Sequence, residues 1–101
     1  MTAIARLEIT PIREQNMSEE IARAVSELED FDVEYEVTPI GTVIEAEEIG
    51  EIYDAAKAAH EAVDVERVIT ALEIDDHRPR DQHAESRVEA VERELDQLGQ
   101  D

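Results

Sequence analysis

The sequence predicts an α+β fold, a ferredoxin-like βαββαβ sandwich with an additional C-terminal helix. Stretches with apolar residues at every second position alternate with stretches that have apolar residues at helical spacing. Their order is strand, helix, strand, strand, helix, strand, helix, and a tight turn joins the two middle strands. Two right-handed crossovers around this hairpin should place both helices on one face of the sheet. The 101 residues are too few for two independent cores, so residues 1–101 should form a single domain.

The first half begins with a strand at residues 3–12, in which alternate residues form an apolar face. Pro11 has no backbone N–H and should end the pairing of this strand. A helix follows a short polar connection, and either Asn16 or Ser18 can cap its N-terminus. The apolar stripe of this helix consists of Met17, Ile21, Val25 and Leu28.

The central hairpin is predicted at residues 33–47. Apolar and polar residues alternate along its first strand, which is typical of a half-buried strand. The sequence Thr38-Pro-Ile-Gly41 fits a type I turn, because proline sets φ at the second position and glycine closes the fourth. Two similar halves flank this hairpin, so we expect it to lie inside the sheet and not at an edge.

The second half repeats the pattern of strand and helix. An apolar stripe that includes Ile52, Ala56 and His60 predicts a helix, which Glu47 and Glu48 open. The last strand is predicted at residues 68–75, and a polar loop at residues 76–82 follows it. A third helix is predicted beyond this loop, ended by Gly99. Its apolar stripe consists of Ala84, Val88, Val91, Leu95 and Leu98.

The charge of the chain is extreme, with 28 acidic against 9 basic residues and a formal net charge of −19. The apolar periodicity is regular throughout, which argues against disorder as the explanation. An acidic coat with Lys57 as the only lysine is typical of a halophilic protein in a cytoplasm of very high salt, where ions screen self-repulsion. The charge also argues against nucleic acid as a partner, because there is no basic stripe to contact phosphates.

Absent features exclude several classes of protein. The chain has no cysteine, so disulfides, thiolate metal sites and cysteine nucleophiles are excluded. Its N-terminus lacks the basic and apolar regions of a signal peptide. No apolar run approaches the ~20 residues of a membrane span. We therefore expect a soluble, cytoplasmic protein without membrane insertion.

The sheet face that the two crossover helices leave uncovered carries a mixture of apolar and charged residues. It is too apolar for a solvated face and too polar for a core. We interpret it as a subunit interface with a ligand near its rim, and the third helix could cover part of it or pack on a neighbouring subunit. The residues that indicate this interface are Ile4, Arg6, Thr10, Thr38, Ile69 and Ala71.

The hairpin carries the first candidate ligand contacts. A carboxyl such as that of Glu45 and a hydroxyl such as that of Thr42 could together bind an aminopyrimidine. Gly41 marks a place where a ligand could approach the backbone, and Tyr35 could stack on a ligand cation. The alternatives are that Glu45 is a solvated acid and that Tyr35 is a core ring. The polar cluster of the hairpin consists of Tyr35, Thr38, Thr42 and Glu45.

The second half offers further candidates, each with an alternative. We favour His60 as a satisfied core or interface histidine over a metal ligand, because only one carboxylate, that of Asp64, is near. Arg78 and Arg80 could clamp a phosphate or carboxylate, although pairing with neighbouring aspartates is favoured. A cation site in the last loop is likewise disfavoured against a solvated acidic loop. Its ligands would be Asp75, Asp76, His77, Asp81 and His83.

No catalytic constellation is visible in the sequence. The serines have no His–Asp arrangement near them, and the three glycines are scattered and form no phosphate-binding loop. We therefore expect a non-enzymatic protein with no catalytic residues, no metal and no cofactor. A hydrolase or transferase that uses the His/Asp/Arg loop is the disfavoured alternative.

Four segments together resemble a known family. They are Tyr35-Glu-Val, Gly41-Thr-Val-Ile-Glu-Ala-Glu47, Ala55-Ala-Lys-Ala-Ala-His-Glu-Ala62 and Ile74-Asp-Asp-His-Arg78. With them the chain resembles, over essentially its whole length, the small thiamine-binding, YkoF-like family of archaeal and bacterial proteins. The Gly-Thr-x-x-Glu and Ala-Ala-His-Glu-Ala elements are the specific part. His77, Pro79 and the very acidic surface depart from the family pattern.

The resemblance implies a ferredoxin-like domain that assembles into homo-oligomers, as tetramers built from two dimers. It also implies binding of thiamine or its hydroxymethylpyrimidine moiety. A regulatory or structural oligomer, with an unidentified effector or protein partner, is the alternative. The positions that match the family are Tyr35, Gly41, Thr42, Glu45 and His60, followed by Asp75 and Arg78; Thr38 joins them from the polar cluster.

Overall fold

The computed structural model describes residues 2–79 and 83–99. Within these residues the fold is α+β, with an antiparallel sheet of four strands and three α-helices. A short 3-10 helix, η1, extends the first α-helix. The strands are β1 (Ala3–Pro11), β2 (Glu34–Thr38), β3 (Gly41–Ala46) and β4 (Val68–Asp75). The helices are α1 (Met17–Ser26), η1 (Glu27–Asp30), α2 (Ile49–Ala62) and α3 (Ala84–Leu98).

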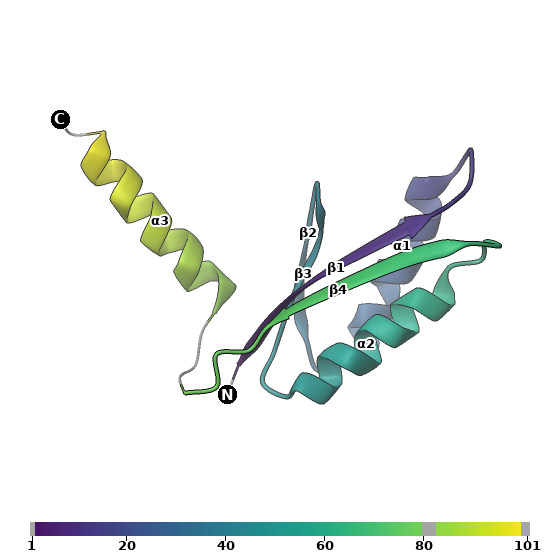
Figure 1. Ribbon diagram of the computed structural model, residues 1–101, viewed down its shortest axis with the longest axis horizontal. Helices are drawn as coiled ribbons and strands as arrows, with labels where there is room; N and C mark the ends of the chain where they lie inside the picture. The colour runs from purple at the N-terminus through teal and green to yellow at the C-terminus, as the bar shows by residue number, and fades with distance from the viewer. Residues whose placement is uncertain (1, 80–82, 100–101) are drawn as a thin grey trace.

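The strands lie in the order β2-β3-β1-β4, and each neighbouring pair is antiparallel. This order, with α1 and α2 as the crossovers, is consistent with the predicted ferredoxin-like arrangement and its additional C-terminal helix (Figure 1). The expected position of the hairpin is half wrong. β3 lies inside the sheet beside β1, whereas β2 is an edge strand.

The core lies between the sheet and the two crossover helices. Leu28 of η1, Ile44 of β3 and Ile52 of α2 are fully buried. Alanines at positions 55 and 59 of α2 are also fully buried, and their small side chains let this helix approach the sheet closely. The core is therefore aliphatic, as the low aromatic content of 3% predicts.

The predicted cap of α1 is wrong in its mechanism. Asn16 stands at the N-cap, but its backbone is left-handed (φ 63°) and its side chain makes no capping hydrogen bond. Asparagine tolerates this conformation better than most residues. Ser18, the alternative cap, lies inside the helix. Asn16 therefore sets the direction in which the chain enters α1, and its backbone carbonyl accepts the N–H of Glu20 at 3.3 Å.

The face of the sheet opposite α1 and α2 is not covered by them, and we call it the open face. The strand register places Ile4, Arg6, Glu8 and Thr10 of β1 on it, beside Val43 and Glu45 of β3 and Ile69, Ala71, Glu73 and Asp75 of β4. Helix α3 begins at one end of the open face and projects away from the rest of the molecule (Figure 1). The predicted mixture of apolar and charged residues is thus present on this face.

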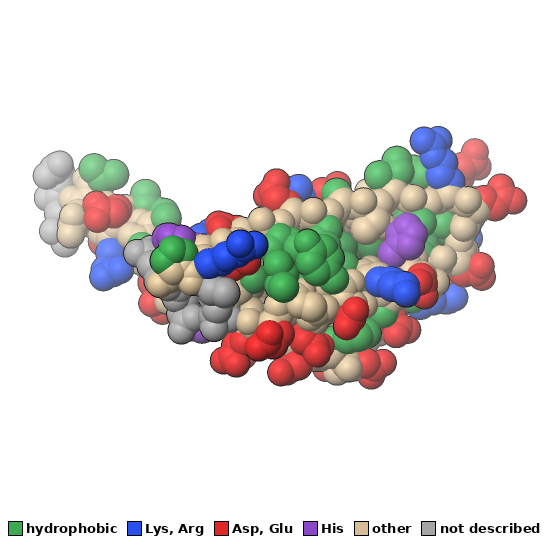
Figure 2. Space-filling view, turned by 60° about the horizontal axis from the view of Figure 1, so that its bottom comes forward, with side chains coloured by type: hydrophobic (Ala, Val, Ile, Leu, Met, Phe, Trp, Pro, Cys, Tyr) green, Lys and Arg blue, Asp and Glu red, His purple; other side chains and the backbone are tan. Residues whose placement is uncertain are grey.

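Acidic side chains dominate the surface. Figure 2 shows Asp and Glu gathered along the margins of one side of the molecule, with a hydrophobic area between them. No helix in the described part of the chain is both long and apolar enough to cross a membrane.

Candidate functional site

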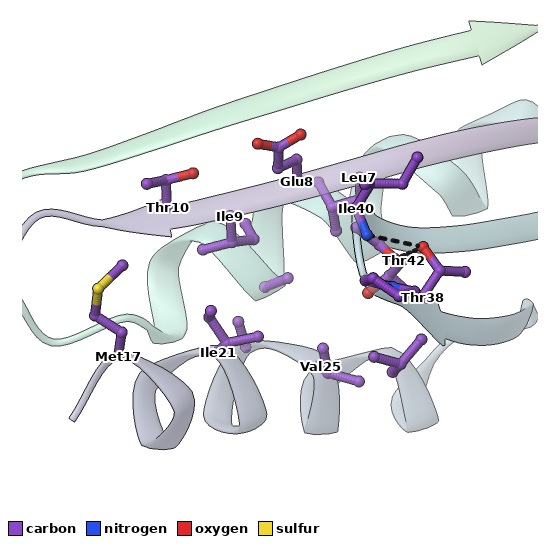
Figure 3. A pocket seen from close by; sticks show the side chains of 15 residues that line it. Leu7, Glu8, Ile9, Thr10, Met17, Ile21, Val25, Thr38, Ile40 and Thr42 are labelled. Atoms are coloured by element: carbon purple, nitrogen blue, oxygen red, sulfur yellow. Dashed lines mark hydrogen bonds between the residues drawn. The ribbon is translucent and has the colours of Figure 1, made fainter.

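A cavity of about 250 Å³ lies between α1, β1 and the turn of the β2–β3 hairpin. Figure 3 shows Met17, Ile21 and Val25 of α1 facing Leu7 and Ile9 of β1, with the hairpin turn at one end. The walls of this cavity are therefore largely aliphatic. Polar groups come from the hairpin, where Thr38, Gly41 and Thr42 line it. We call it the hairpin pocket.

Hydrogen bonds hold the hairpin turn in a fixed shape beside this pocket. The Thr38 hydroxyl donates to the Gly41 carbonyl at 2.7 Å and accepts the Ile40 backbone N–H at 3.3 Å. From the open face, the Arg6 guanidinium donates to the Ile40 carbonyl at 3.0 Å and to Glu8 Oε2 at 2.7 Å. The Ile40 side chain is 70% exposed beside the pocket.

Gly41 serves the packing of two strands. Its φ is +127°, a value that residues with a Cβ rarely adopt. A Cβ at this position would lie 2.9 Å from the backbone carbonyl oxygen of Leu7 in the neighbouring strand. The close approach predicted for a ligand is thus made by β1 itself.

Thr42 and Glu45 do not lie together, so the prediction that both bind one aminopyrimidine within a chain is wrong. Thr42 pairs with Leu7 and is buried on the helix-covered face, where it lines the hairpin pocket. Glu45 pairs with Ile4 and lies on the open face. Residues three apart in a strand point to opposite sides of the sheet because side chains alternate with period two.

Glu45 belongs to a second cavity of about 540 Å³ on the open face, beneath the first turns of α3. Its floor includes Val43, and its rim is acidic. His83, which precedes α3, brings its Nδ1 to 2.7 Å from Glu45 Oε1. The predicted candidate Glu45 therefore has a partner within the chain. The acidic residues around this cavity are Glu34, Glu36, Glu45 and Glu85.

The candidates of the last loop pair with neighbours in the chain. Arg78 Nε lies 3.1 Å from Asp76 Oδ2, which confirms the favoured alternative of pairing with an aspartate. Asp75 Oδ2 lies 2.8 Å from Arg87 Nη1 of α3. The candidates Arg80 and Asp81 lie outside the described residues. No group of three or more potential metal ligands occurs in the part of the chain that the structure describes.

His60 lies on α2 but is exposed, so the core half of the predicted core or interface position is wrong, and the interface half stays a prediction. Its Nδ1 lies 2.6 Å from Thr70 Oγ1 of β4. Tyr35 lies on β2 at the sheet edge, on the helix-covered side, and its hydroxyl donates to Glu29 of η1. Neither residue lines the hairpin pocket. The structure thus groups Thr38, Gly41 and Thr42 at the hairpin pocket. It places Tyr35 and Thr38 with Glu45 at the open-face cavity, and His60 lines neither of the two.

The Tyr35–Glu29 contact gives a prediction about pH. The hydrogen bond to Glu29, then desolvation and the negative charge of Glu29, raise the pKa of Tyr35 above its ordinary 10.0. The folded state favours the protonated phenol, so this contribution to stability is present below pH 10 and is lost as pH rises through the folded pKa. In a Tyr53→Phe background, ultraviolet titration should place the Tyr35 midpoint above 10, and Glu29→Gln should lower it. An unchanged midpoint in Glu29→Gln would contradict this.

The pocket itself does not follow from the sequence. The spacing of Met17, Ile21 and Val25 predicts an apolar stripe that packs in the core. It does not indicate that these side chains line a cavity. Ile40 offers one signal. A large aliphatic residue in a predicted turn has no core to enter, so it marks an exposed apolar surface.

The geometry of the cavities does not show which family the chain belongs to, whereas comparison with known proteins does. The sequence model described as "Thiamine-binding protein" matches residues 5–92 of this chain. The chain belongs to the thiamine-binding protein family. This confirms the resemblance seen in the Gly-Thr-x-x-Glu and Ala-Ala-His-Glu-Ala elements.

Relatives and solved structures agree with this membership. A UPF0045 protein of Methanothermobacter thermautotrophicus is 41% identical over 83 residues, which is 79% of this chain and 84% of the relative. The UPF0045 protein YqgV of Bacillus subtilis is 33% identical over 102 residues, 92% of this chain and 97% of that protein. The crystal structure of MJ1052 from Methanocaldococcus jannaschii superposes with a TM-score of 0.82 at 29% identity, covering 89% of this chain and 95% of the other.

A more distant structure shares the fold. A Thermotoga maritima protein, for which a role in thiamine biosynthesis or salvage has been suggested, superposes with a TM-score of 0.78 at 24% identity. The match covers 90% of this chain and 99% of that chain.

Proposed function

We propose that this protein is a non-enzymatic, cytoplasmic binding protein for thiamine or its hydroxymethylpyrimidine moiety, and that it acts as a homo-oligomer. Family membership supports thiamine as the ligand class. The observation that carries the proposal within the chain is the hairpin pocket. Its aliphatic walls suit the apolar faces and the methyl group of a pyrimidine ring. The threonine hydroxyls at the hairpin end can hydrogen-bond the ring nitrogens and the amino group.

The size of the pocket favours the pyrimidine over the whole vitamin as the buried part. Its volume of about 250 Å³ lies below the ~300–1,000 Å³ of sites that enclose drug-sized ligands. The pyrimidine would enter the pocket, and the thiazolium cation would remain outside near the hairpin turn. There the net charge of −19 favours a cation, although concentrated salt screens this attraction.

Two single substitutions distinguish the hairpin pocket from the open-face cavity. Thr42→Val keeps the shape of the side chain and removes a hydroxyl from the hairpin pocket. We expect it to weaken thiamine or hydroxymethylpyrimidine binding about tenfold, the effect of one lost hydrogen bond. Glu45→Gln, on the opposite face, should leave affinity unchanged. Titration calorimetry in concentrated potassium chloride measures both.

Thermal unfolding provides the test of the ligand itself. A ligand at about 100 times its dissociation constant stabilises the folded state by ~2.7 kcal/mol, which is a measurable rise in melting temperature. The absence of any shift with thiamine, hydroxymethylpyrimidine or their phosphates would remove the proposal. Weakened binding in Glu45→Gln alone would instead move the ligand to the open face.

The uncovered sheet face and the projecting helix α3 favour a second candidate, a regulatory or structural oligomer with another effector. This candidate expects assembly without ligand and no thermal shift with thiamine compounds. Sedimentation and thermal unfolding on one preparation therefore separate the two.

A further inference from the structure

The turn at the end of the β2–β3 hairpin, residues 38–41, forms one end of the hairpin pocket. All four of its residues line that pocket. The turn has little apolar anchoring, because Ile40 is 70% exposed and Val37, just before the turn, is 60% exposed. It also follows β2, an edge strand that has a neighbouring strand on one side only. The shape of the turn therefore depends on its hydrogen bonds.

Two of these hydrogen bonds lie within the turn, and a third reaches it from another strand. The Thr38 hydroxyl makes the two inner bonds, to the Gly41 carbonyl and from the Ile40 backbone N–H. The third comes from Arg6 of β1, an inner strand, whose Nη1 donates to the Ile40 carbonyl at 3.0 Å. Arg6 and Ile40 are 34 positions apart in the chain. This bond thus ties the turn to the middle of the sheet.

The side chain of Arg6 is held in place for this contact. Its Nη1 also lies 2.7 Å from Glu8 Oε2, and Glu8 is two residues further along β1 on the same face of the sheet. A Cβ at position 41 would lie 3.6 Å from both Arg6 Cγ and Glu8 Cβ, so the two side chains flank the start of β3. The Arg6 side chain is 35% exposed. Water therefore competes less for the guanidinium than it does at a fully exposed position.

The choice of acceptor distinguishes Arg6 from other arginines of the chain. With 28 acidic and 9 basic residues, an arginine has many carboxylates to pair with. Arg13, Arg23 and Arg78 hydrogen-bond carboxylates. Arg6 divides one nitrogen between a carboxylate and the backbone carbonyl of Ile40. The turn thereby gains a charged donor, and hydrogen bonds from charged donors are stronger than those between neutral groups.

We propose that Arg6 is a positioning residue of the hairpin pocket. From the open face, it holds the turn in the conformation in which the pocket binds its ligand. This deepens the proposed function and rests on it for the identity of the ligand. Arg6 is not among the residues that line the pocket, and it acts on them through the Ile40 carbonyl. A residue on one face of the sheet thus sets the affinity of a site on the other face.

Nitrogen-15 relaxation of the backbone amides, measured without ligand, tests the effect on the turn. In the wild-type protein the amides of Ile40 and Gly41 should have order parameters near ~0.85, the value of rigid backbone. Arg6→Met keeps a stem of similar length but has no donor, so it should lower these values toward ~0.6. The amide of Ile44, within the β1–β3 ladder, should not change. A turn that is mobile in the wild type, or equally rigid in Arg6→Met, would overturn the proposal.

Titration calorimetry with hydroxymethylpyrimidine, in concentrated potassium chloride, tests the effect on the pocket. If the turn keeps its bound conformation for roughly a tenth to a third of the time, the apparent affinity falls by that fraction. Arg6→Met should therefore weaken binding about three- to tenfold. Arg6→Lys keeps a charged donor on a long stem and should recover part of this loss. Arg93→Met removes the same charge from an exposed position of α3 and should leave the affinity unchanged.

Each other outcome of the titration has a definite meaning. Equal losses in Arg6→Met and Arg6→Lys would mean that the stem acts by packing alone, and an equal loss in Arg93→Met would mean that net charge is responsible. Either result, or full affinity in Arg6→Met, would overturn the proposal. A wild-type protein that binds neither thiamine nor hydroxymethylpyrimidine would remove the proposed function. The relaxation of the turn, which needs no ligand, would then still decide whether Arg6 positions it.

Discussion

Replacing Gly41 by alanine should lower the free energy of unfolding by about 2–4 kcal/mol, the sum of an unfavourable φ and a steric clash. The φ of +127° is rarely adopted by a residue with a Cβ. The added Cβ would stand 2.9 Å from the Leu7 carbonyl, and neither strand can shift without disturbing the ladder between β1 and β3. Thermal and urea unfolding in the same salt measure the change. For a domain of this size it amounts to a fall of about 10 °C or more in melting temperature.

Gly50→Ala is the matched control for this prediction. Gly50 lies in the first turn of α2, and a Cβ there would have no atom within 4 Å. Alanine favours the helix by up to ~1 kcal/mol over glycine, so the same substitution should stabilise the protein. Equal effects at both positions would show that the contact between Gly41 and Leu7 is not what requires glycine.

The fold could be predicted because most of its elements follow from local pattern. The β4 strand, Val68–Asp75, alternates apolar and polar residues along its whole length, and the structure has it at the predicted residues. The α3 helix also begins at Ala84 and ends before Gly99 as expected. The edge position of β2 could not be read in this way, because sheet order depends on which strands pair across the chain.

The candidate site was less predictable, although one error was avoidable. The separation of Thr42 from Glu45 follows from the period of two in a strand, which holds for any residues three apart in a regular strand. The hairpin pocket is a different case. The pocket depends on the position of α1 relative to β1 and the hairpin turn. The spacing of Met17, Ile21 and Val25 predicts only that one side of the helix is apolar.

Contacts between distant residues were also beyond sequence reasoning. His83 lies 38 residues from Glu45, and its pairing follows from the position of the loop after β4. The sequence suggested only that Glu45 could bind an aminopyrimidine and that His83 could be a ligand of a cation. Because its partner lies within the chain, Glu45 is a weaker candidate for a ligand contact than its place in the Gly-Thr-x-x-Glu element indicated.

Glu20 shows that a residue in a helix's first turn can have a role that its position conceals. The sequence places Glu19 and Glu20 together where the helix dipole favours acids. The structure separates them, because the Glu19 side chain is 64% exposed and that of Glu20 only 5%. Glu20 Oε2 accepts the Asp64 backbone N–H at 2.9 Å, and Oε1 lies 3.4 Å from Arg13 Nη1. One carboxylate thus joins α1 to the connection between α2 and β4.

Glu20→Ala should therefore lower the free energy of unfolding by about 2–3 kcal/mol, the value of charged hydrogen bonds lost from a buried acceptor. Glu20→Gln keeps an acceptor for the Asp64 N–H and should recover about half of that loss. Glu19→Ala removes an acid from the same turn and should change stability by less than about 0.5 kcal/mol, because exposed ion pairs contribute little. Urea unfolding of the three variants at one salt concentration decides the matter. If Glu19→Ala and Glu20→Ala cost the same, the acids act through the dipole alone and the tie to Asp64 is not a determinant of stability.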